Sequence, residues 1–344
     1  MNYELLAFSG FPAHELFCLK PKIRTVFCKL RVGPNTRIRM KRYIIRRLLL
    51  GVVVVWIVSV LIFLATRASG DPVLMMADPG ASEEELDAIR DRYGLNLPLP
   101  IQYVVFMVNS LKGDFGQSLF QGTEASQLIV ERIPATLELL LAAKLISLAI
   151  GITGGVMAVA SRRKWIKNAV RMFSLLGLSM PNFWIALLGM LLFSVFLGVL
   201  PTSGRGAIQH LIMPAFALGW YFSAGYTRIT YSALLEVLNQ EYIKLARIKG
   251  LPEWLVIGKH ALKNAMIPVI TLAGMNVVIM ISAAVPIETV FAWPGLGYLL
   301  YTSAGNRDFN VVQGVVLIIS IFMVLLNLLV DILYAYLDPR IRYK

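Results

Sequence analysis

The chain has 344 residues, of which 57% are hydrophobic and 15% charged. Soluble domains carry about 25% charged residues, and here the apolar residues are gathered into long uncharged runs, which excludes an ordinary soluble fold. The formal net charge is +13, but the basic residues flank the apolar runs and do not line one face between aromatic residues. The basic residues are therefore expected on the cytoplasmic side of a membrane protein. We predict no nucleic-acid partner from them.

Residues 1–39 show no sustained hydrophobic period and lack the apolar core and cleavage site of a signal peptide. Cys18 and Cys28, the two cysteines of the chain, lie here at a spacing that favours two free thiols over a metal site. A basic flank at Met40 directly precedes the first apolar run. We expect residues 1–39 to be a disordered extension or a mis-called start.

Six apolar stretches are long enough for a transmembrane helix, which needs about 20 residues to cross the bilayer core. The second stretch begins before Lys144, at about residue 139, and the end of the third, 200–204, is set aside as a turn because it contains Pro201 and Gly204. The uncharged stretches are 48–66, 145–161, 172–204, 211–227, 264–287 and 309–330. The sequence thus predicts an all-α integral membrane protein with six transmembrane helices.

Lysine and arginine are concentrated in alternate connecting segments. Five basic residues lie between 162 and 171 and six between 228 and 263, whereas the two shorter connectors on the other side hold only Arg205 and Arg307. Basic residues also flank the first helix and end the chain. The positive-inside rule places both termini in the cytoplasm.

The segment 67–138 is expected to be one mostly helical external insert after the first helix. We expect it to contain an acidic helix that Ser82 can cap and that ends near Gly94, with the acidic residues Glu83, Glu84, Glu85, Asp87 and Asp91. We interpret its charges as a solvated helix face. The predicted organisation is therefore 1–39 extension, 40–66 basic flank and first helix, 67–138 external insert, and 139–344 five-helix core with a cytoplasmic connector at 234–264.

That connector carries the most functional information. Its apolar residues recur at near-helical spacing, Gly250 has the conformational freedom to close a helix in a left-handed conformation, and Pro252 can begin the next helix. The pattern predicts a helix, a tight turn and a second helix, with two apolar faces to cover. A soluble partner that binds one of these faces is the simplest explanation.

Residues 241–251, which read Glu-Tyr-Ile-Lys-Leu-Ala-Arg-Ile-Lys-Gly-Leu, resemble the coupling loop of binding-protein-dependent ABC transporter permeases. The stretch from 259 to Pro268 extends the match, which is closest to the branch that imports dipeptides, oligopeptides and nickel. At the Glu-Ala-Ala positions of the broad family signature the chain has Lys-Leu-Ala, so only Ala246 and Gly250 agree. Further segments resemble that branch in the same order from Met40 onwards: 70–72, 94–95, 113–116, 133–138, 179–184, 200–204, 288–297 and 331–340.

The resemblance implies a permease subunit in a bacterial or archaeal inner membrane that forms half of a translocation pathway. It also implies a second related permease, in a heterodimer rather than a homodimer, two ATP-binding subunits and an extracytoplasmic substrate-binding protein. This chain has no Gly-x-x-x-x-Gly-Lys-Ser/Thr motif, so ATP and Mg²⁺ are expected in the partner subunits and no enzymatic activity in this one. The residues expected to couple to the ATPase are Glu241, Tyr242, Lys244, Ala246, Arg247, Lys249 and Gly250.

Two charged residues near the spans are candidate contacts for substrate or for the binding protein. Lys144 lies inside the second stretch, where a charge is functional by default, but its long side chain is expected to reach the external interface. Glu288 either contacts a ligand or holds the last external loop in shape. His210 and His260 are predicted on opposite sides of the membrane, so neither supports a metal site or nickel as cargo, and peptides are the favoured cargo.

Two other classes of membrane protein fit the sequence less well. A secondary transporter driven by an ion gradient is the main alternative, but internal repeats and buried carboxylates at mid-membrane, which are typical of that class, are not evident in the sequence. A membrane-embedded enzyme would need a convergent catalytic set in the spans, and the sequence of the spans shows none.

Glycines such as Gly151, Gly154 and Gly155 are interpreted as positions where two helices pack closely.

Overall fold

The computed structural model describes residues 34–70, 73, 80, 82–92 and 95–337. The chain divides into two units, Met1–Leu49 and Leu50–Lys344. The described part of the first unit is the beginning of helix α1 (Pro34–Ala68), which includes residues 34–39 of the predicted extension. The rest of that extension, 1–33, lies outside the described residues.

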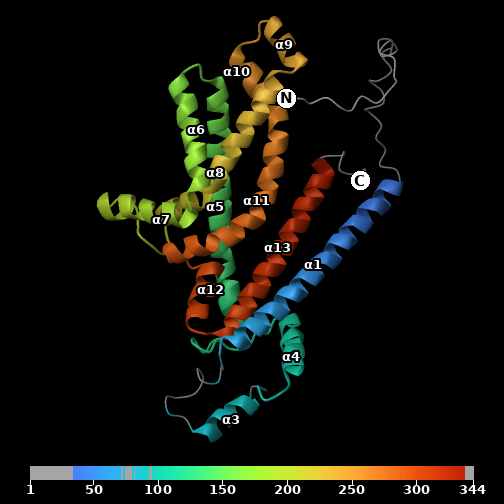
Figure 1. Ribbon diagram of the computed structural model, residues 1–344, viewed down its shortest axis with the longest axis vertical. Coiled ribbons are helices and arrows are strands. Elements are labelled where there is room, and N and C mark those ends of the chain that lie inside the picture. Colours follow the sequence, from blue (N-terminus) through green and yellow to red (C-terminus); the bar gives the residue numbers. More distant parts are fainter. Residues whose placement is uncertain (1–33, 71–72, 74–79, 81, 93–94, 338–344) are drawn as a thin grey trace, which may run out of the picture. The chain divides into compact units, whose positions relative to one another are not determined.

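The regular elements of the second unit, in the ranges that the structure describes, are helices joined by loops, and the β contact among them is one isolated bridge between Gln117 and Glu124 (Figure 1). After α1 its elements are α3 (Glu83–Arg92), α4 (Leu99–Leu111), α5 (Ala125–Ala160), α6 (Lys164–Ser179), α7 (Asn182–Gly189), η2 (Met190–Phe196), α8 (Ile208–Leu238), α9 (Glu241–Ile248), α10 (Glu253–Leu255), η3 (Val256–Ala261), α11 (Leu262–Val290), α12 (Leu296–Gly305) and α13 (Phe309–Leu337). The segments η2 and η3 are π-helical turns.

By length and composition, four helical stretches among the described residues can cross a membrane. They are Ile44–Ala68, Ala125–Ala160, Glu253–Val290 and Phe309–Ile332, and the bent pair of α6 with α7 and η2 can supply a fifth. The predicted crossing at 211–227 lies within α8, which is long enough but less apolar than the others. This crossing, the fourth of the six predicted, is therefore not established by composition alone.

The third apolar run is broken rather than straight. Helix α6 ends at Ser179 and α7 begins at Asn182, and the axes of the two parts differ by 110°. Met180 takes an extended conformation, with ψ of 130°, because the residue before a proline is disfavoured in the helical region. Pro181 thus turns one predicted helix into two (Figure 1).

Helix α5 begins earlier than the sequence predicts. The charged residues Glu131, Arg132 and Glu138 place the predicted start at 139, but the helix runs without interruption from Ala125 through Pro134. The predicted external insert, 67–138, and the second apolar stretch therefore share one helix.

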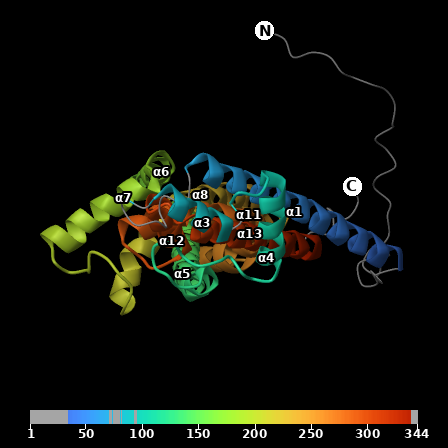
Figure 2. The same ribbon diagram turned by 90° about the horizontal axis from the view of Figure 1, so that it is seen from below.

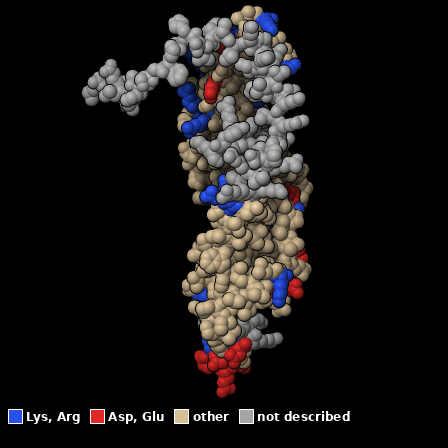
Figure 3. All heavy atoms as spheres, turned by 90° about the vertical axis from the view of Figure 1, so that its right-hand side faces the viewer, with Lys and Arg blue, Asp and Glu red and all other residues tan. Residues whose placement is uncertain are grey.

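Within the insert, the capping prediction for α3 is confirmed. The backbone N–H of Glu85 donates to Ser82 Oγ at 3.3 Å, and the backbone N–H of Ser82 donates to Glu85 Oε2 at 2.9 Å. This reciprocal capping box satisfies two donors at the start of the helix. Figure 3 shows acidic side chains gathered at the lower end of its view, the end at which Figure 1 draws α3.

The centre of the second unit is built from α5, α8 and α11, which lie together in both ribbon views (Figure 2). Small residues allow α5 and α8 to approach closely. A Cβ added at Gly155 would lie 3.0 Å from the carbonyl oxygen of Thr227, and one at Gly219 would lie 2.9 Å from that of Ala143. The close-packing interpretation of the α5 glycines is therefore confirmed.

Candidate functional site

The connector between α8 and α11 has the predicted helix, turn and helix. At the end of α9 the Leu251 N–H donates to Ala246 O at 3.3 Å and the Gly250 N–H donates to Arg247 O at 2.9 Å. These two bonds, with Gly250 at a φ of +77°, define a Schellman motif. Pro252 then takes the N-cap position of α10. The prediction that Gly250 adopts a left-handed conformation is confirmed.

Helix α9 has one buried and one exposed apolar face. Ile243 is fully buried and Ala246 nearly so, and both pack with Val256 in a cluster shared with α8 and η3. On the other side of α9, Tyr242 (42%), Leu245 (57%) and Ile248 (80%) are exposed, and in α10 Trp254 is also exposed (73%). We call these four residues the docking face. The helix is therefore fixed to its own chain on one side and presents an apolar surface on the other.

Ion pairs surround the turn. Arg247 donates to both carboxylate oxygens of Glu253, at 2.7 and 3.2 Å, and so joins α9 to α10. The hydrogen bond to Glu253 raises the pKa of Arg247 above its already high ordinary value. Lys244 pairs with Glu241 at 2.8 Å. Since both pairs are exposed, each adds only about 0–1 kcal/mol of stability, and their main effect is on geometry.

Of the residues expected to contact the ATPase, Ala246 is buried in the chain's own core. The other six are exposed: Glu241, Tyr242, Lys244, Arg247, Lys249 and Gly250. Leu245, Ile248 and Trp254 were not among the predicted contact residues. The sequence contains a signal for these exposed residues, because Leu245 and Ile248 are three residues apart in α9 and Trp254 follows Pro252. This spacing alone does not tell which of the two apolar faces of α9 is buried.

Glu288 lies near the end of α11 and is fully buried. Its carboxylate accepts hydrogen bonds from Thr136 Oγ1 at 2.8 Å, from the Gly297 N–H at 2.7 Å and from the Tyr298 N–H at 3.1 Å. It thus caps α12 and links α5, α11 and α12. A side chain at Gly295 would collide with the carboxylate, so this glycine is required for the close approach. Contact between Glu288 and a ligand would require this arrangement to open.

We expect Glu288→Ala to lower the free energy of unfolding by about 3 kcal/mol, because two backbone N–H groups of α12 would lose their acceptor. Glu288→Gln is expected to cost about 1 kcal/mol, since a carboxamide oxygen can still accept both bonds. Thermal unfolding of the purified protein in detergent measures both. Unchanged unfolding in Glu288→Ala, with reduced transport, would instead indicate direct contact with a ligand.

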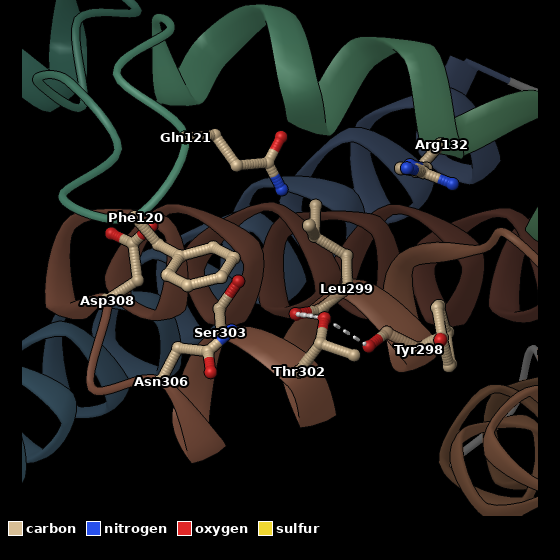
Figure 4. Close-up of a pocket in the computed structure, with 9 residues that line it drawn as sticks. All are labelled: Phe120, Gln121, Arg132, Tyr298, Leu299, Thr302, Ser303, Asn306 and Asp308. Atoms are coloured by element: carbon tan, nitrogen blue, oxygen red, sulfur yellow. Dashed lines mark hydrogen bonds between the residues drawn. The ribbon is translucent and has the colours of Figure 1, made fainter.

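A hollow of about 230 Å³ lies beside α12 (Figure 4). Its other walls are Arg132 of α5 and the residues Phe120 and Gln121, which precede α5 in the chain. Arg132 supplies the one basic side chain of its lining, and Asp308 lies at the other end. Asp308 is engaged by Ser118 Oγ and by the Leu119 N–H, which holds the segment before α5 onto the end of α12. This side of the unit is therefore tied together by buried or half-buried polar contacts.

Lys144 does not reach out along the helix as predicted. It lies near the middle of α5, and its ammonium donates to Tyr226 Oη at 2.7 Å and to the carbonyl oxygen of Ala273. It also lies 5.1 Å from the centre of the Tyr226 ring. The prediction that the side chain extends to the external interface is wrong, because α5 starts at Ala125 and polar groups of α8 and α11 hold the ammonium inside.

Both parts of the chain match models of known families. Residues 40–140 match the N-terminal model of binding-protein-dependent transport system membrane components, and residues 150–343 match the model "Binding-protein-dependent transport system inner membrane component". The chain belongs to this family. It is a multi-pass inner membrane protein, and a subunit of a transport system.

Similar members of the family include the oligopeptide transport system permease protein AppB of Bacillus subtilis, which is 40% identical over 316 residues, 88% of this chain and 100% of AppB. The glutathione transport system permease protein GsiC of Escherichia coli (strain K12) is 37% identical over 306 residues, 89% of this chain and 100% of GsiC. The permease resemblance seen in the sequence is therefore confirmed.

Two solved structures share the fold of this inner membrane component. A chain of the inward-facing MetNI methionine ABC transporter superposes with a TM-score of 0.51 at 18% sequence identity. The superposition covers 62% of this chain and 97% of the MetNI chain. An amino acid ABC transporter crystallised with histidines gives 0.50 at 16% identity, with 62% and 95% covered. The all-helical permease fold is thereby supported.

Proposed function

We propose that this chain is the transmembrane subunit of an ATP-driven importer of peptides, and that it couples to an ATPase through α9 and α10. The observation that carries the proposal is the docking face of Tyr242, Leu245, Ile248 and Trp254 beside a rigid glycine turn. Exposed apolar residues grouped on two short helices, here α9 and α10, are characteristic of a partner surface. ATP and Mg²⁺ belong to that partner.

In this proposal the chain crosses the membrane six times, with both termini and the connector in the cytoplasm. Helix α8 is the fourth of these crossings in chain order. Its side chains Phe222, Tyr226 and Leu234 are all buried, so it packs among other helices and needs less apolar surface than a helix that faces lipid. The basic connectors at 162–171 and 228–263 lie on the cytoplasmic side.

The substrate is proposed to be a peptide because relatives that match almost the whole chain are named as oligopeptide and glutathione permeases. The full transporter then contains a second related permease, two ATP-binding subunits and an extracytoplasmic binding protein. ATP binding would bring the ATPases together, displace α9, and transmit the movement through α8 and α11 to the pathway.

Replacing Ile248 with aspartate is expected to weaken the binding of the ATPase roughly tenfold to a hundredfold, because a side chain of this size contributes about 1.5–3 kcal/mol when it is buried. Co-purification of the ATPase with the detergent-solubilised permease measures the effect. Ile208→Asp is the matched control, since Ile208 is 71% exposed at the opposite end of α8. Equal loss in both variants would contradict a specific docking face.

The energy source separates this function from the ion-gradient transporter. In sealed vesicles that contain the complete transporter, uptake of a labelled tripeptide should require ATP hydrolysis and persist when ionophores collapse the ion gradients. Uptake that survives without hydrolysis and stops with the ionophores would favour the secondary transporter and overturn the proposal.

A further inference from the structure

Lys144, Tyr226 and Asn276 come together from the middle of the three central helices. Lys144 is near the midpoint of α5, Tyr226 is in the central part of α8, and Asn276 is at the midpoint of α11. Lys144 Nζ donates to Tyr226 Oη at 2.7 Å and Asn276 Nδ2 donates to the same oxygen at 3.4 Å. Three polar groups from separate helices thus meet at one level.

In the described part of the chain, the ammonium of Lys144 has no opposite charge beside it. Both acceptors of the ammonium, Tyr226 Oη and Ala273 O, are uncharged. The nearest acidic residue along α5, Glu138, pairs with Arg205 at 2.6 Å instead, and Glu288 is bound by α12. Within the residues that the structure describes, no carboxylate forms an ion pair with Lys144.

Such a cation is costly to keep inside a membrane protein. An ammonium has three donors, and the two interactions above use two of them. Asn276 adds a further amide donor beside Tyr226. The cluster therefore offers a positive charge and spare N–H groups but no negative charge, which suits a carboxylate supplied from outside the chain.

We infer that Lys144, with Tyr226 and Asn276, forms a binding station for a carboxylate group of the substrate at the middle of the translocation pathway. The inference rests on the proposed peptide transport and adds the substrate group that is recognised. A passing carboxylate would accept a charge-assisted hydrogen bond from Lys144 and another from Asn276. Release requires only that the ammonium return to its contacts with α8 and α11.

Uptake by the complete transporter in vesicles tests this with trialanine and trialanine amide as probes. Lys144→Met, which keeps an unbranched side chain only one atom shorter and removes its charge, should lower trialanine uptake roughly tenfold to a hundredfold, the effect expected for loss of a hydrogen bond to a charged group. Uptake of the amide, whatever its rate in the unmodified transporter, should change less than twofold. Lys144→Arg should restore most of the trialanine uptake.

An equal loss for both probes would mean that Lys144 only holds the helices together, and no loss for either would mean that the pathway avoids it. Both results overturn the inference.

A second readout needs no peptide. In a background without Cys18 and Cys28, the thiol of Lys144→Cys should react with the membrane-impermeant reagent sulfonatoethyl methanethiosulfonate at least about tenfold faster than that of Leu145→Cys, because position 144 opens to the aqueous pathway. This variant lacks the ammonium, so the rate tests access to the site and not its charge. Leu145 is the matched control because it is the next residue and 59% exposed on another side of α5. In this inference that side faces lipid, where a thiol stays neutral and reacts slowly. Equal rates would overturn the inference even if uptake proves to be ATP-driven. ATP-independent uptake together with a fast reaction of the Lys144→Cys variant would instead reject only the importer mechanism.

Discussion

Replacing Gly250 with proline is expected to abolish ATP-driven uptake while the permease still accumulates in the membrane. Gly250 has a φ of +77°, which proline cannot adopt because its ring fixes φ near −65°. Proline also removes the N–H that donates to Arg247 O at 2.9 Å. The Schellman motif would be lost, and α9 would no longer present its docking face at a fixed angle to α10.

The rest of the fold should tolerate this change, since nothing lies within 4 Å of a Cβ built at Gly250. Gly250→Ala, which strains only the left-handed conformation by about 1–2 kcal/mol, should retain partial uptake. Gly250→Asn should retain more, because asparagine visits this conformation more readily. When the three variants are compared at equal membrane levels, uptake should be highest in Gly250→Asn, lower in Gly250→Ala and lowest in Gly250→Pro. Normal uptake in Gly250→Pro would contradict a coupling role for the turn.

The second large effect is expected on folding. Gly151→Ala should destabilise the permease by at least about 3 kcal/mol, the upper range for overpacking a core. The new Cβ would lie 3.0 Å from Ser223 O and 3.2 Å from Thr227 N, and would collide with the Cβ of Tyr226. These are mostly backbone atoms of α8, so relief requires the two helices to move apart. Thermal unfolding in detergent and the amount of protein in the membrane measure the loss.

Gly225→Ala on α8 is the matched control. A Cβ there has nothing within 4 Å, and alanine is favoured over glycine inside a helix by about 0.5–1 kcal/mol. Gly225→Ala should therefore be neutral or slightly stabilising. If the two alanine variants unfold at the same temperature, close packing of α5 against α8 is not what holds the centre of the unit together.

Local rules of backbone chemistry explain which features were predictable from the sequence. The capping box of Ser82 with Glu85 and the left-handed Gly250 depend on residues at most a few positions apart. Such contacts follow from residue type and spacing. The long apolar runs likewise identify helices, because a bilayer requires backbone hydrogen bonds within each segment.

Features that depend on neighbouring helices were not predictable in the same way. The charged residues before 139 ended the predicted apolar stretch, but they do not interrupt α5, which starts at Ala125. The bend at Pro181 was not predicted because the residues on both sides of it form one continuous apolar run. The direction of Lys144 is decided by acceptors on two other helices, Tyr226 and Ala273. Which face of α9 is exposed likewise depends on what α8 and η3 cover.

The most direct test of the coupling role is a photo-cross-link from the docking face. With benzoylphenylalanine in place of Ile248, irradiated membranes should yield an adduct with a subunit that carries the Gly-x-x-x-x-Gly-Lys-Ser/Thr motif. The adduct yield should change between ATP-bound and ATP-free states, and the same label at Ile208 should give no such adduct. An absence of any ATPase adduct from position 248, in a transporter that is active in uptake, would contradict the account.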